Sequence, residues 1–515
     1  MENISLTTVT VTSLFAAAFV IFLFRKSSTI RFSQLPPGPR QVAFIGNVLE
    51  LSVRSPWVTF SAWAKAYGPV VYASFFGDPY IIISSADVAS EFLDQNSVIS
   101  SARPVLTMAS LTGYDKLLPL LPPDRRFKAT RACLQRGLNA ESVARYSQDH
   151  QNNAIIFVHR LLKTPHPEVM SEIRRCVAIG IGRITYGTEI SAVTSKYVEL
   201  GEQALAVFGL VTNPNYWAVD MLPILRFLPS LLPGMSFKRQ SDKWRTGIVK
   251  DIVDVPFHET MEEIKHGRHL ECLVSQSICD SSRSAMDEEE YLDIVKWAAC
   301  SSYLGGTETS VSFLSTFFLA MLLHPNIQKR AQDEIDAITG GIRLPEFSDR
   351  QALPFIDCIF KELLRWQPPA PLVFPHILEK EHTLRSMSLP RGSVVCVNAW
   401  EILQDEINYP DPKNFHPERF LDPEVPSSFG PSFGYGRRVC PGFQLANRSL
   451  WMIMSTTLAL VDITCPIDDK TGEPKTVKVE YTEGPMRQPV PFDCVINMRK
   501  NINIDESSLQ RLDNI

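Results

Sequence analysis

The chain has 515 residues and a mass of 57.9 kDa, enough for one large domain or several small ones. Hydrophobic residues make up 45% and charged residues 21%, as in ordinary globular proteins, which excludes a disordered or wholly membrane-embedded chain. The formal net charge of −5 argues against nucleic acid as a partner. The ten cysteines include no C-x-x-C pair, so we expect reduced thiols rather than a zinc module or a secreted disulfide scaffold.

The first predicted element is a membrane anchor. Residues 4–24 contain no charged side chain and, as a helix, are long enough to cross a bilayer once. Arg25 and Lys26 follow directly, so the positive-inside rule predicts a cytosolic body. A cleaved signal peptide is the alternative. However, the basic pair Arg25 and Lys26 stands where a signal peptide would carry the small residues of its cleavage site. We expect a transmembrane anchor at residues 1–24 and a basic, proline-rich linker at residues 25–40.

The body at residues 41–500 shows no linker and no repeat, so we expect one large domain, followed by a polar tail at residues 501–515. Two β-rich runs, 70–75 and 80–83, predict a hairpin with its turn at residues 77–79. Beyond residue 87 the apolar spacing is mostly helical, as in 292–323 and 355–366, and a further strand is expected at 393–397. The predicted fold class is mainly α with a minor β-sheet part.

One predicted helix is unusually long. It begins at the acidic run 287–290, which suits the positive end of a helix dipole, and meets no proline before Pro325. Gly305 and Gly306 lie inside it, and each costs about 1 kcal/mol relative to alanine. We therefore expect the two glycines to serve packing or function.

The clearest chemical signal is the ten-residue segment 433–442. Its glycines permit a tight turn that presents Cys440, and Gly442 leads into a predicted helix at 443–458. Backbone N–H groups and the positive helix end are expected to favour a thiolate, which can serve as the axial ligand of haem iron. The alternative is a buried structural cysteine.

This segment is similar to the F-x-x-G-x-R-x-C-x-G haem-binding signature of the cytochrome P450 superfamily. All five fixed positions match, and they are Phe433, Gly436, Arg438, Cys440 and Gly442. Three further family motifs follow the family's order along the chain. The resemblance implies a haem-thiolate monooxygenase that binds haem b (iron protoporphyrin IX) and uses O2.

The run 305–310 resembles the family's oxygen-activation motif. The resemblance implies that Gly305 and Gly306 let the helix approach the macrocycle. The hydroxyl of Thr309 can turn from its i−4 carbonyl towards dioxygen, and Glu308 can relay protons. By itself, the pattern is also compatible with a solvated acid beside a helix-bending threonine.

Two more motifs predict a buried charge network. Glu362 and Arg365 match E-x-x-R, whose spacing puts both side chains on one helix face, and Arg419 belongs to a P-E-R-F segment. On its own an E-x-x-R pair is usually a surface ion pair. The resemblance implies a structural rather than catalytic role for the three residues.

The resemblance also implies cationic partners for the haem propionates. Arg438, His376 and Arg131 are the candidates, although His376 can equally be a surface histidine. The family usually carries W-x-x-x-R on an early helix, and this chain lacks that tryptophan. The spacing can be matched as Phe127 with Arg131 or as Arg126 with Thr130.

No nicotinamide or flavin signature is found, so electrons are expected from a separate NADPH-dependent membrane reductase of the endoplasmic reticulum, with cytochrome b5 as a further partner. The segments that line the pocket in the family are largely apolar, which favours a hydrophobic small molecule. They correspond here to residues 101–121, 207–232, 297–309, 368–374 and 481–486. The overall pattern, including residues 398–400 and 409–412, looks most like fungal enzymes of secondary metabolism. A terpenoid substrate is favoured over a polyketide or an indole.

Two other classes of haem protein remain open from the sequence. A haem-thiolate isomerase, dehydratase or peroxygenase keeps the cysteine but needs neither a proton relay nor a reductase. A non-catalytic haem sensor or carrier shows no turnover. Dependence of turnover on NADPH and reductase distinguishes these classes from a monooxygenase.

Overall fold

The computed structural model describes residues 34–52, 54–163, 168–188, 195–213, 216–279, 286–468, 470–500 and 502. The predicted anchor at residues 1–24 and nearly all of the predicted tail lie outside these residues. The described residues form two compact units. The first unit comprises residues 34–104, Leu372–Ile402 and Tyr435–Arg438, and the second comprises Val105–Pro371, Leu403–Gly434 and residues from 439 onwards. The single domain at 41–500 stays a prediction.

The first unit is built on a small mixed sheet. Four strands lie in the order β1 (Val70–Phe75), β2 (Asp78–Ile83), β6 (Val394–Val397) and β3 (His376–Ile377). Strands β1 and β2 form the predicted antiparallel hairpin, and β2 pairs with β6 in parallel. The unit also contains α2 (Pro56–Tyr67), α3 (Ala86–Leu93) and the ribbon of β4 (His382–Leu384) and β5 (Met387–Leu389).

The hairpin turn lies earlier than the sequence suggested. Phe76 and Gly77 form it, with φ angles of 50° and 82°, and β2 already begins at Asp78. Two central residues with positive φ match the right-handed twist of the flanking strands. Pro79 lacks an N–H group, and it precedes Tyr80, where pairing with β6 begins.

Both faces of this sheet are buried, which explains its continuous apolar strands. Val70, Tyr72, Ile81, Ile83, Val395 and Val397 contribute to one cluster of buried side chains. Val71, Ala73, Phe75, Ile82, Val394 and Cys396 contribute to the other. Successive side chains alternate between the two clusters, as the period of two in a β-strand requires.

The second unit is mainly helical and surrounds one large apolar core. Its longer helices are α5 (Arg125–Leu138), α7 (Ser147–Lys163), α8 (Val169–Tyr186), α9 (Ser195–Val211), α11 (Ser236–Trp244), α12 (Lys250–Lys265), α14 (Glu288–Leu323), α15 (Pro325–Thr339), α16 (Pro354–Trp366) and α19 (Phe443–Leu460). Shorter elements are α4 (Thr107–Thr112), α6 (Ala140–Arg145), α10 (Ala218–Met221), α13 (Leu273–Ile278), η7 (Pro417–Leu421), α18 (Phe429–Phe433) and the ribbon of β7 (Val461–Thr464) and β8 (Val495–Met498). The mainly helical class with small sheets is therefore confirmed.

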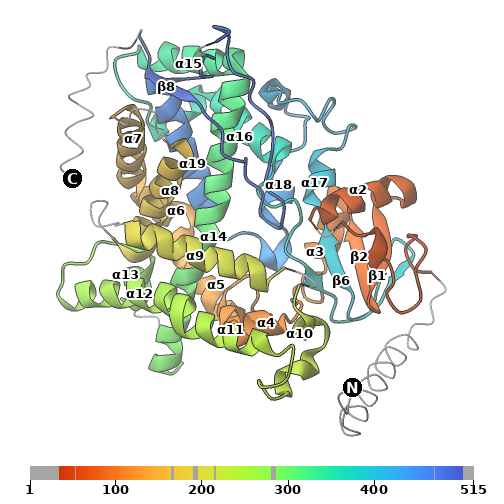
Figure 1. The fold of residues 1–515 in the computed structure, drawn as a ribbon. Coiled ribbons are helices and arrows are strands. Elements are labelled where there is room, and N and C mark those ends of the chain that lie inside the picture. The colour runs from red at the N-terminus through yellow and green to blue at the C-terminus, as the bar shows by residue number, and fades with distance from the viewer. Residues whose placement is uncertain are drawn as a thin grey trace, which may run out of the picture. The chain divides into compact units, whose positions relative to one another are not determined.

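Helix α14 is the predicted long helix and runs through the helices of this unit (Figure 1). Asp287 caps it, because its Oδ2 accepts hydrogen bonds from the N–H groups of Glu289 and Glu290. It spans 36 residues and ends before Pro325, without interruption at the two glycines. Within the described part of the chain it is the one helix long and apolar enough to cross a membrane, but 78% of its most apolar window is buried in the protein. It is a core helix.

Candidate functional site

Cys440 lies in the loop that leads into α19, within the second unit. Its N–H donates a hydrogen bond of 2.7 Å to the carbonyl of Phe433, which closes the loop. Gly442 is the N-cap of α19, so the thiol faces the backbone N–H groups of Gly442 and Phe443 at the positive end of the helix. The structure therefore places the sulfur among donors that can orient a thiolate.

The surroundings of Cys440 act on its pKa in opposite directions. Burial of the sulfur is the largest effect and raises the pKa. The N–H groups of Gly442 and Phe443 and the guanidinium of Arg131 lower it, without cancelling burial. The backbone N–H groups therefore act in the expected direction, and burial of the sulfur outweighs them. A bound metal cation deprotonates a coordinating thiol, so the donors orient a thiolate that the metal would create.

Arg131 extends from α5 to the cysteine segment. Its Nη1 donates a hydrogen bond of 2.6 Å to the carbonyl of Val439, the residue before Cys440. Arg126, the competing match to the early-helix motif, forms an ion pair of 2.7 Å with Asp293 on α14. The structure thus brings Arg131, and not Arg126, to the cysteine segment.

Two signature residues pack directly around the cysteine segment. The ring of Phe433 lies edge-on to the ring of Phe443, with 4.9 Å between centroids. A Cβ atom at Gly442 would lie 3.7 Å from the Sγ of Cys440, so a side chain there would contact the sulfur. Both residues shape the space next to the thiol.

Gly436 belongs to the first unit and is fixed by backbone geometry. Its φ angle is +54°, and a Cβ atom would lie 2.4 Å from the carbonyl oxygen of Leu93. Its N–H donates a hydrogen bond of 2.6 Å to Oδ1 of Asp94. No residue with a side chain fits this position without displacing backbone.

The two glycines of α14 have different surroundings. A Cβ atom at Gly306 would lie 2.7 Å from Cδ1 of Ile181 on α8, so this glycine allows α8 to pack closely. Gly305 has no neighbouring atom within 4 Å of the same position. The sequence had given both the same role. The structure assigns Gly306 to helix packing and leaves open space at Gly305.

Thr309 lies one turn after Gly305 on the same face of α14. Its hydroxyl donates a hydrogen bond of 2.8 Å to the carbonyl of Gly305. Threonine in this arrangement can exchange its i−4 carbonyl for another acceptor by rotating its side chain. The open space at Gly305 leaves room for such an acceptor.

Glu308 is half-buried on α14. Burial raises the pKa of its carboxyl, the guanidinium of Arg174 lowers it, and the carboxylate of Glu202 raises it further, so that the net pKa lies above the ordinary value. Among the residues that the structure describes, none donates a hydrogen bond to this carboxyl. It is therefore not tied to one protonation state by a direct partner.

The three residues of the predicted charge network lie together in the second unit. Arg365 makes two hydrogen bonds to Glu362, of 2.7 and 2.8 Å, and the Nε of Arg419 lies 3.2 Å from Oε2 of Glu362. Glu362 and Arg365 are fully buried. The remaining N–H groups of Arg365 donate to the carbonyls of Leu403, Pro412 and Asn414. A surface ion pair is excluded.

The first unit gathers cationic groups around His376. This residue is 2% exposed, so a surface histidine is excluded. Its Nδ1 donates a hydrogen bond of 2.6 Å to the carbonyl of Ser100, and its buried Nε2 has no hydrogen-bond partner in the described structure. Burial, followed by the charges of Arg103 and Arg438, lowers the pKa of His376 to about 3. The Nε of Arg438 donates to the carbonyl of Ser101.

Arg103 is the residue that sequence reasoning missed. Its Nη1 donates to the carbonyls of Phe374 and Pro375, at 2.6 and 2.8 Å, and so fixes the segment before His376. Burial and the like charge of Arg438 lower its pKa. The available signal was a basic residue at the start of the largely apolar stretch 101–121. A charge in such a stretch needs partners or an anion.

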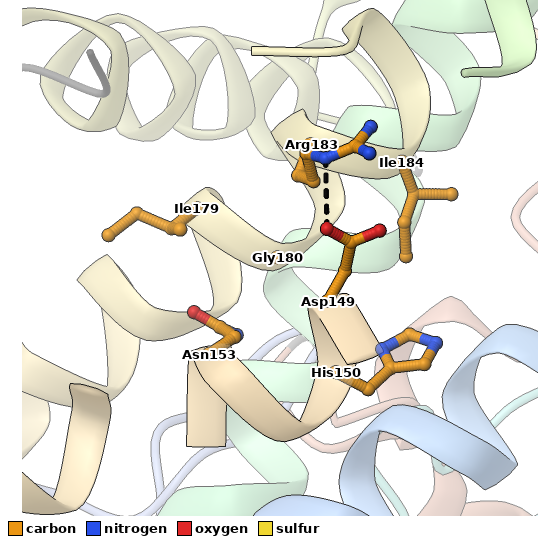
Figure 2. A pocket seen from close by; sticks show the side chains of 7 residues that line it. All are labelled: Asp149, His150, Asn153, Ile179, Gly180, Arg183 and Ile184. Atoms are coloured by element: carbon orange, nitrogen blue, oxygen red, sulfur yellow. Dashed lines mark hydrogen bonds and ion pairs between the residues drawn. The ribbon is translucent and has the colours of Figure 1, made fainter. Parts of the chain in front are cut away.

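A separate hollow lies between α7 and α8, and Figure 2 shows its lining. The space between its lining side chains is too narrow to hold a water molecule. Asp149 and Arg183 form an ion pair of 3.1 Å at its edge, and His150 lies beside them. None of the residues singled out by the sequence motifs lines it.

A comparison with protein families decides the identity of the fold and its site. The family model for Cytochrome P450 matches residues 36–483. The chain belongs to the cytochrome P450 family. The cysteine loop, the long helix with Thr309 and the buried Glu362 network are therefore parts of a cytochrome P450 domain.

Fungal relatives of this cytochrome P450 match along nearly their whole length. Cytochrome P450 monooxygenase 208 of Postia placenta is 34% identical over 94% of this chain and 94% of its own. Cytochrome P450 monooxygenase ppsD of Aspergillus oryzae is 35% identical over 90% of this chain and 89% of its own. Like these relatives, the chain is a monooxygenase, which is an oxidoreductase.

Solved structures agree on the fold. A zebra fish cytochrome P450 with progesterone has a TM-score of 0.69 at 23% identity and covers 86% of this chain and 99% of its own. The structure with abiraterone has a TM-score of 0.67 at 22% identity, with 86% and 100% covered. The likeness supports a mainly helical cytochrome P450 fold with small sheets.

Membership of the family implies a haem cofactor, O2, electrons from a reductase and, in general, hydrophobic substrates. The side chains of this chain fit a haem group on two counts. Cys440 offers a sulfur ringed by N–H donors in the second unit. In the first unit, the positive charges of Arg103 and Arg438 act on the buried His376, and this gathering of cationic groups suits an anionic group such as a propionate.

Proposed function

We propose that the chain inserts one oxygen atom from O2 into a hydrophobic small molecule, and that the thiolate of Cys440 would bind the iron of haem b. The observation that carries the proposal is the position of this sulfur, which faces the N–H groups of Gly442 and Phe443 at the start of α19. Donors around a thiolate sulfur orient it and tune its electron donation to a metal. A structural cysteine has no need of this arrangement.

Haem b, when bound, activates O2 with two electrons and two protons, so that one oxygen atom enters the substrate and the other leaves as water. Arg438, Arg103 and Arg131 would hold its propionates through charge and hydrogen bonds, with the neutral ring of His376 beside Arg103 and Arg438. Gly305 has no atom within 4 Å of a Cβ position and would leave room for the macrocycle beside α14. Gly436 and Phe433 keep the cysteine segment in its turn.

Thr309 and Glu308, both on α14, deliver protons to the reaction site. The hydroxyl of Thr309 leaves the carbonyl of Gly305 to donate into the open space beside it. Glu308, half-buried and without a direct hydrogen-bond donor in the described structure, takes up a proton and passes it towards Thr309. A positioned acid of this kind contributes about 10² to 10⁴ in rate.

Glu362, Arg365 and Arg419 have a structural role. Their network joins α16 to η7 and to the carbonyls of the segment 403–414. Because all three charges are removed from water, they hold these segments in one arrangement. None of them is assigned to the chemistry.

Electrons come from a separate NADPH-dependent membrane reductase, with cytochrome b5 as a further donor. Residues 1–24 anchor the chain in the endoplasmic reticulum membrane, residues 25–40 link the anchor to the cytosolic domain at 41–500, and residues 501–515 form a polar tail. The apolar run 4–24 and the basic residues after it support this placement.

The substrate is a terpenoid of fungal secondary metabolism. The fungal origin of relatives at 34–35% identity and the apolar character of the candidate pocket segments support this assignment. A polyketide or an indole is the alternative, since such scaffolds are also large and apolar.

The proposal is tested with membranes that contain the full chain and a fungal reductase. A panel of terpenes, polyketides and indoles is incubated with NADPH under ¹⁸O2. The expected result is a product that carries one labelled oxygen atom and that requires both NADPH and reductase. Conversion that needs neither would contradict the proposal and indicate an isomerase, a dehydratase or, with added peroxide, a peroxygenase.

The role of Thr309 is tested with the substrate found in this way. Thr309→Ala is expected to lower product formed per NADPH by about tenfold or more, with peroxide formed instead, because proton delivery is lost. Thr309→Ser keeps the hydroxyl and should retain most of the coupling. Unchanged product per NADPH in Thr309→Ala would remove Thr309 from the relay.

A further inference from the structure

Three elements lie along the stretch of α14 that includes Glu308. Helix α8 runs antiparallel to α14, since Oγ1 of Thr185 lies 3.1 Å from Oγ of Ser302 and Ile181 contacts Gly306 one turn further on. Arg174 lies two turns before Ile181 on α8. The contact therefore continues along α14 past residue 306, to the part of α14 that includes Glu308.

Helix α9 approaches the same stretch of α14. A Cβ atom at Gly201 would lie 3.1 Å from the ring of Tyr303, and the hydroxyl of Tyr303 donates to the carbonyl of Tyr197. Glu202, the next residue on α9, lies 3.6 Å from the Nε of Arg174. The ion pair between α8 and α9 is thus formed where both helices meet α14.

The segment around Gln488 holds the guanidinium from the other side. Oε1 of Gln488 accepts a hydrogen bond of 3.1 Å from Nη2 of Arg174. The preceding residue, Arg487, accepts a hydrogen bond at its carbonyl from Ser312 and donates one of 2.9 Å to Gln367. Because Arg487 is fixed to α14 and to the end of α16, Gln488 is a fixed acceptor for Arg174.

Arg174 therefore forms one ion pair and one hydrogen bond, and a third group, a nearby carboxyl, is not bonded to it. The partners are Glu202 and Gln488, and the unbound carboxyl is that of Glu308. The side chain of Glu202 is 44% exposed and that of Arg174 is 26% exposed. The cluster thus extends from solvent to the acid on α14.

We propose that Arg174 is a positioning residue whose pairing with Glu202 keeps the Glu308 carboxyl free to take up a proton from water and release it towards Thr309. The inference rests on the proton-relay role proposed above. The charged groups that face Glu308 are Arg174 on α8 and Glu202 on α9. Without the anion of Glu202, the guanidinium would act on Glu308 alone and hold it ionised. Without the guanidinium, Glu308 would stay protonated.

Removing the charge of Glu202 and removing the charge of Arg174 are predicted to shift the titration of Glu308 in opposite directions. Two readouts in the holoenzyme test this prediction. The first is the protonated-carboxyl infrared band of Glu308 in the resting enzyme, assigned by its absence in Glu308→Gln and followed against pH. The second is the basic limb of product formation against pH. Glu202→Gln is expected to move both midpoints down by about one pH unit, and Arg174→Gln to move both up by a similar amount.

Two further variants separate positioning from stability. Arg174→Lys keeps a cation at the site and should restore the wild-type midpoints. Glu172→Gln breaks the ion pair of 2.8 Å that α8 makes with Arg160 and should move neither midpoint. Shifts of the same sign in Glu202→Gln and Arg174→Gln, or no shift in either, would overturn the inference.

The outcome for Glu308→Gln distinguishes this inference from the proposed function. If Glu308→Gln leaves rate and product per NADPH unchanged, the relay role of Glu308 fails and the inference fails with it. If Glu308→Gln lowers both while the cluster variants leave the midpoints in place, the relay stands and only the role of Arg174 is wrong.

Discussion

Glu362 shows how a single buried charge depends on its partners. Its carboxylate accepts hydrogen bonds from the buried Arg365 and from the N–H of His416, and it is paired with the buried Arg419. Such a group stabilises its surroundings only while every partner is present. A substitution that removes one of these charges without changing the size of the side chain should therefore lower the free energy of unfolding.

Glu362→Gln is predicted to lower the free energy of unfolding by about 3–5 kcal/mol, because two buried guanidinium groups lose their counter-charge. The measurement is urea unfolding of the holoenzyme followed by circular dichroism. Glu262→Gln, which breaks an exposed pair with Lys265, should be indistinguishable from wild type. If both variants unfold at the same urea concentration as wild type, the network is not structural.

The surroundings of some single residues could be predicted from the sequence, and those of others could not. The positions of Cys440, Glu362 and Arg365 could be predicted because each belongs to a motif with local spacing. The burial of His376 could not, because it depends on Ser100, which is 276 residues away in the chain. Arg103 was missed for the same reason, since its acceptors lie in the segment 374–375.

Gly436 controls the element that precedes the cysteine. It begins the short turn η8 (Gly436–Arg438), and its left-handed φ brings its backbone against the end of α3. A side chain there meets a backbone oxygen of Leu93, which cannot rotate away. The position therefore depends on glycine for both conformation and space.

Gly436→Ala is predicted to destabilise the protein by about 1–3 kcal/mol and to reduce the haem bound per chain. The measurement is haem content by absorbance together with the thermal midpoint. Gly430→Ala is the matched control, because Gly430 lies six residues earlier and has no atom within 4 Å of a Cβ position. Equal haem content in the two variants would contradict the role given to Gly436.

Helix α14 shows what a pattern along one element can and cannot predict. Its length and its acidic N-terminus could be predicted from composition and from the absence of proline. The different roles of Gly305 and Gly306 could not, because they depend on which neighbour faces each residue. Ile181, from a distant part of the sequence, decides the role of Gly306.

For the whole molecule, buried neutral histidines link stability to pH. His150 lies beside the hollow of Figure 2, and burial, together with the charge of Arg448, lowers its pKa to about 3. The unfolded chain binds a proton near pH 6.5 at this residue, whereas the folded chain does not. The contribution of His150 to stability is therefore complete above pH 6.5 and is lost progressively as the pH falls towards 3.

Between pH 7.5 and pH 5.5, wild type is predicted to lose about 1.4 kcal/mol more stability than His150→Gln, whose side chain does not titrate. Urea unfolding of the holoenzyme at the two pH values measures the difference. An equal loss in both proteins would mean that His150 is protonated in the folded state.

The overall fold class and the family could be predicted from the sequence because four motifs occur in order along the chain. The division of the described residues into two compact units could not, because the segments 372–402 and 435–438 join the first unit from far along the chain. Non-local pairing of this kind, such as β2 with β6, leaves no local pattern.

The central claim is that Cys440 binds haem iron as a thiolate. The measurement that tests it most directly is the carbon monoxide difference spectrum of the reduced full-length protein, with wild type beside Cys440→His. The account predicts a strongly red-shifted Soret band in wild type and its loss in a variant that still binds haem. A folded, haem-loaded wild type without that band, or a variant that retains it, would contradict the account.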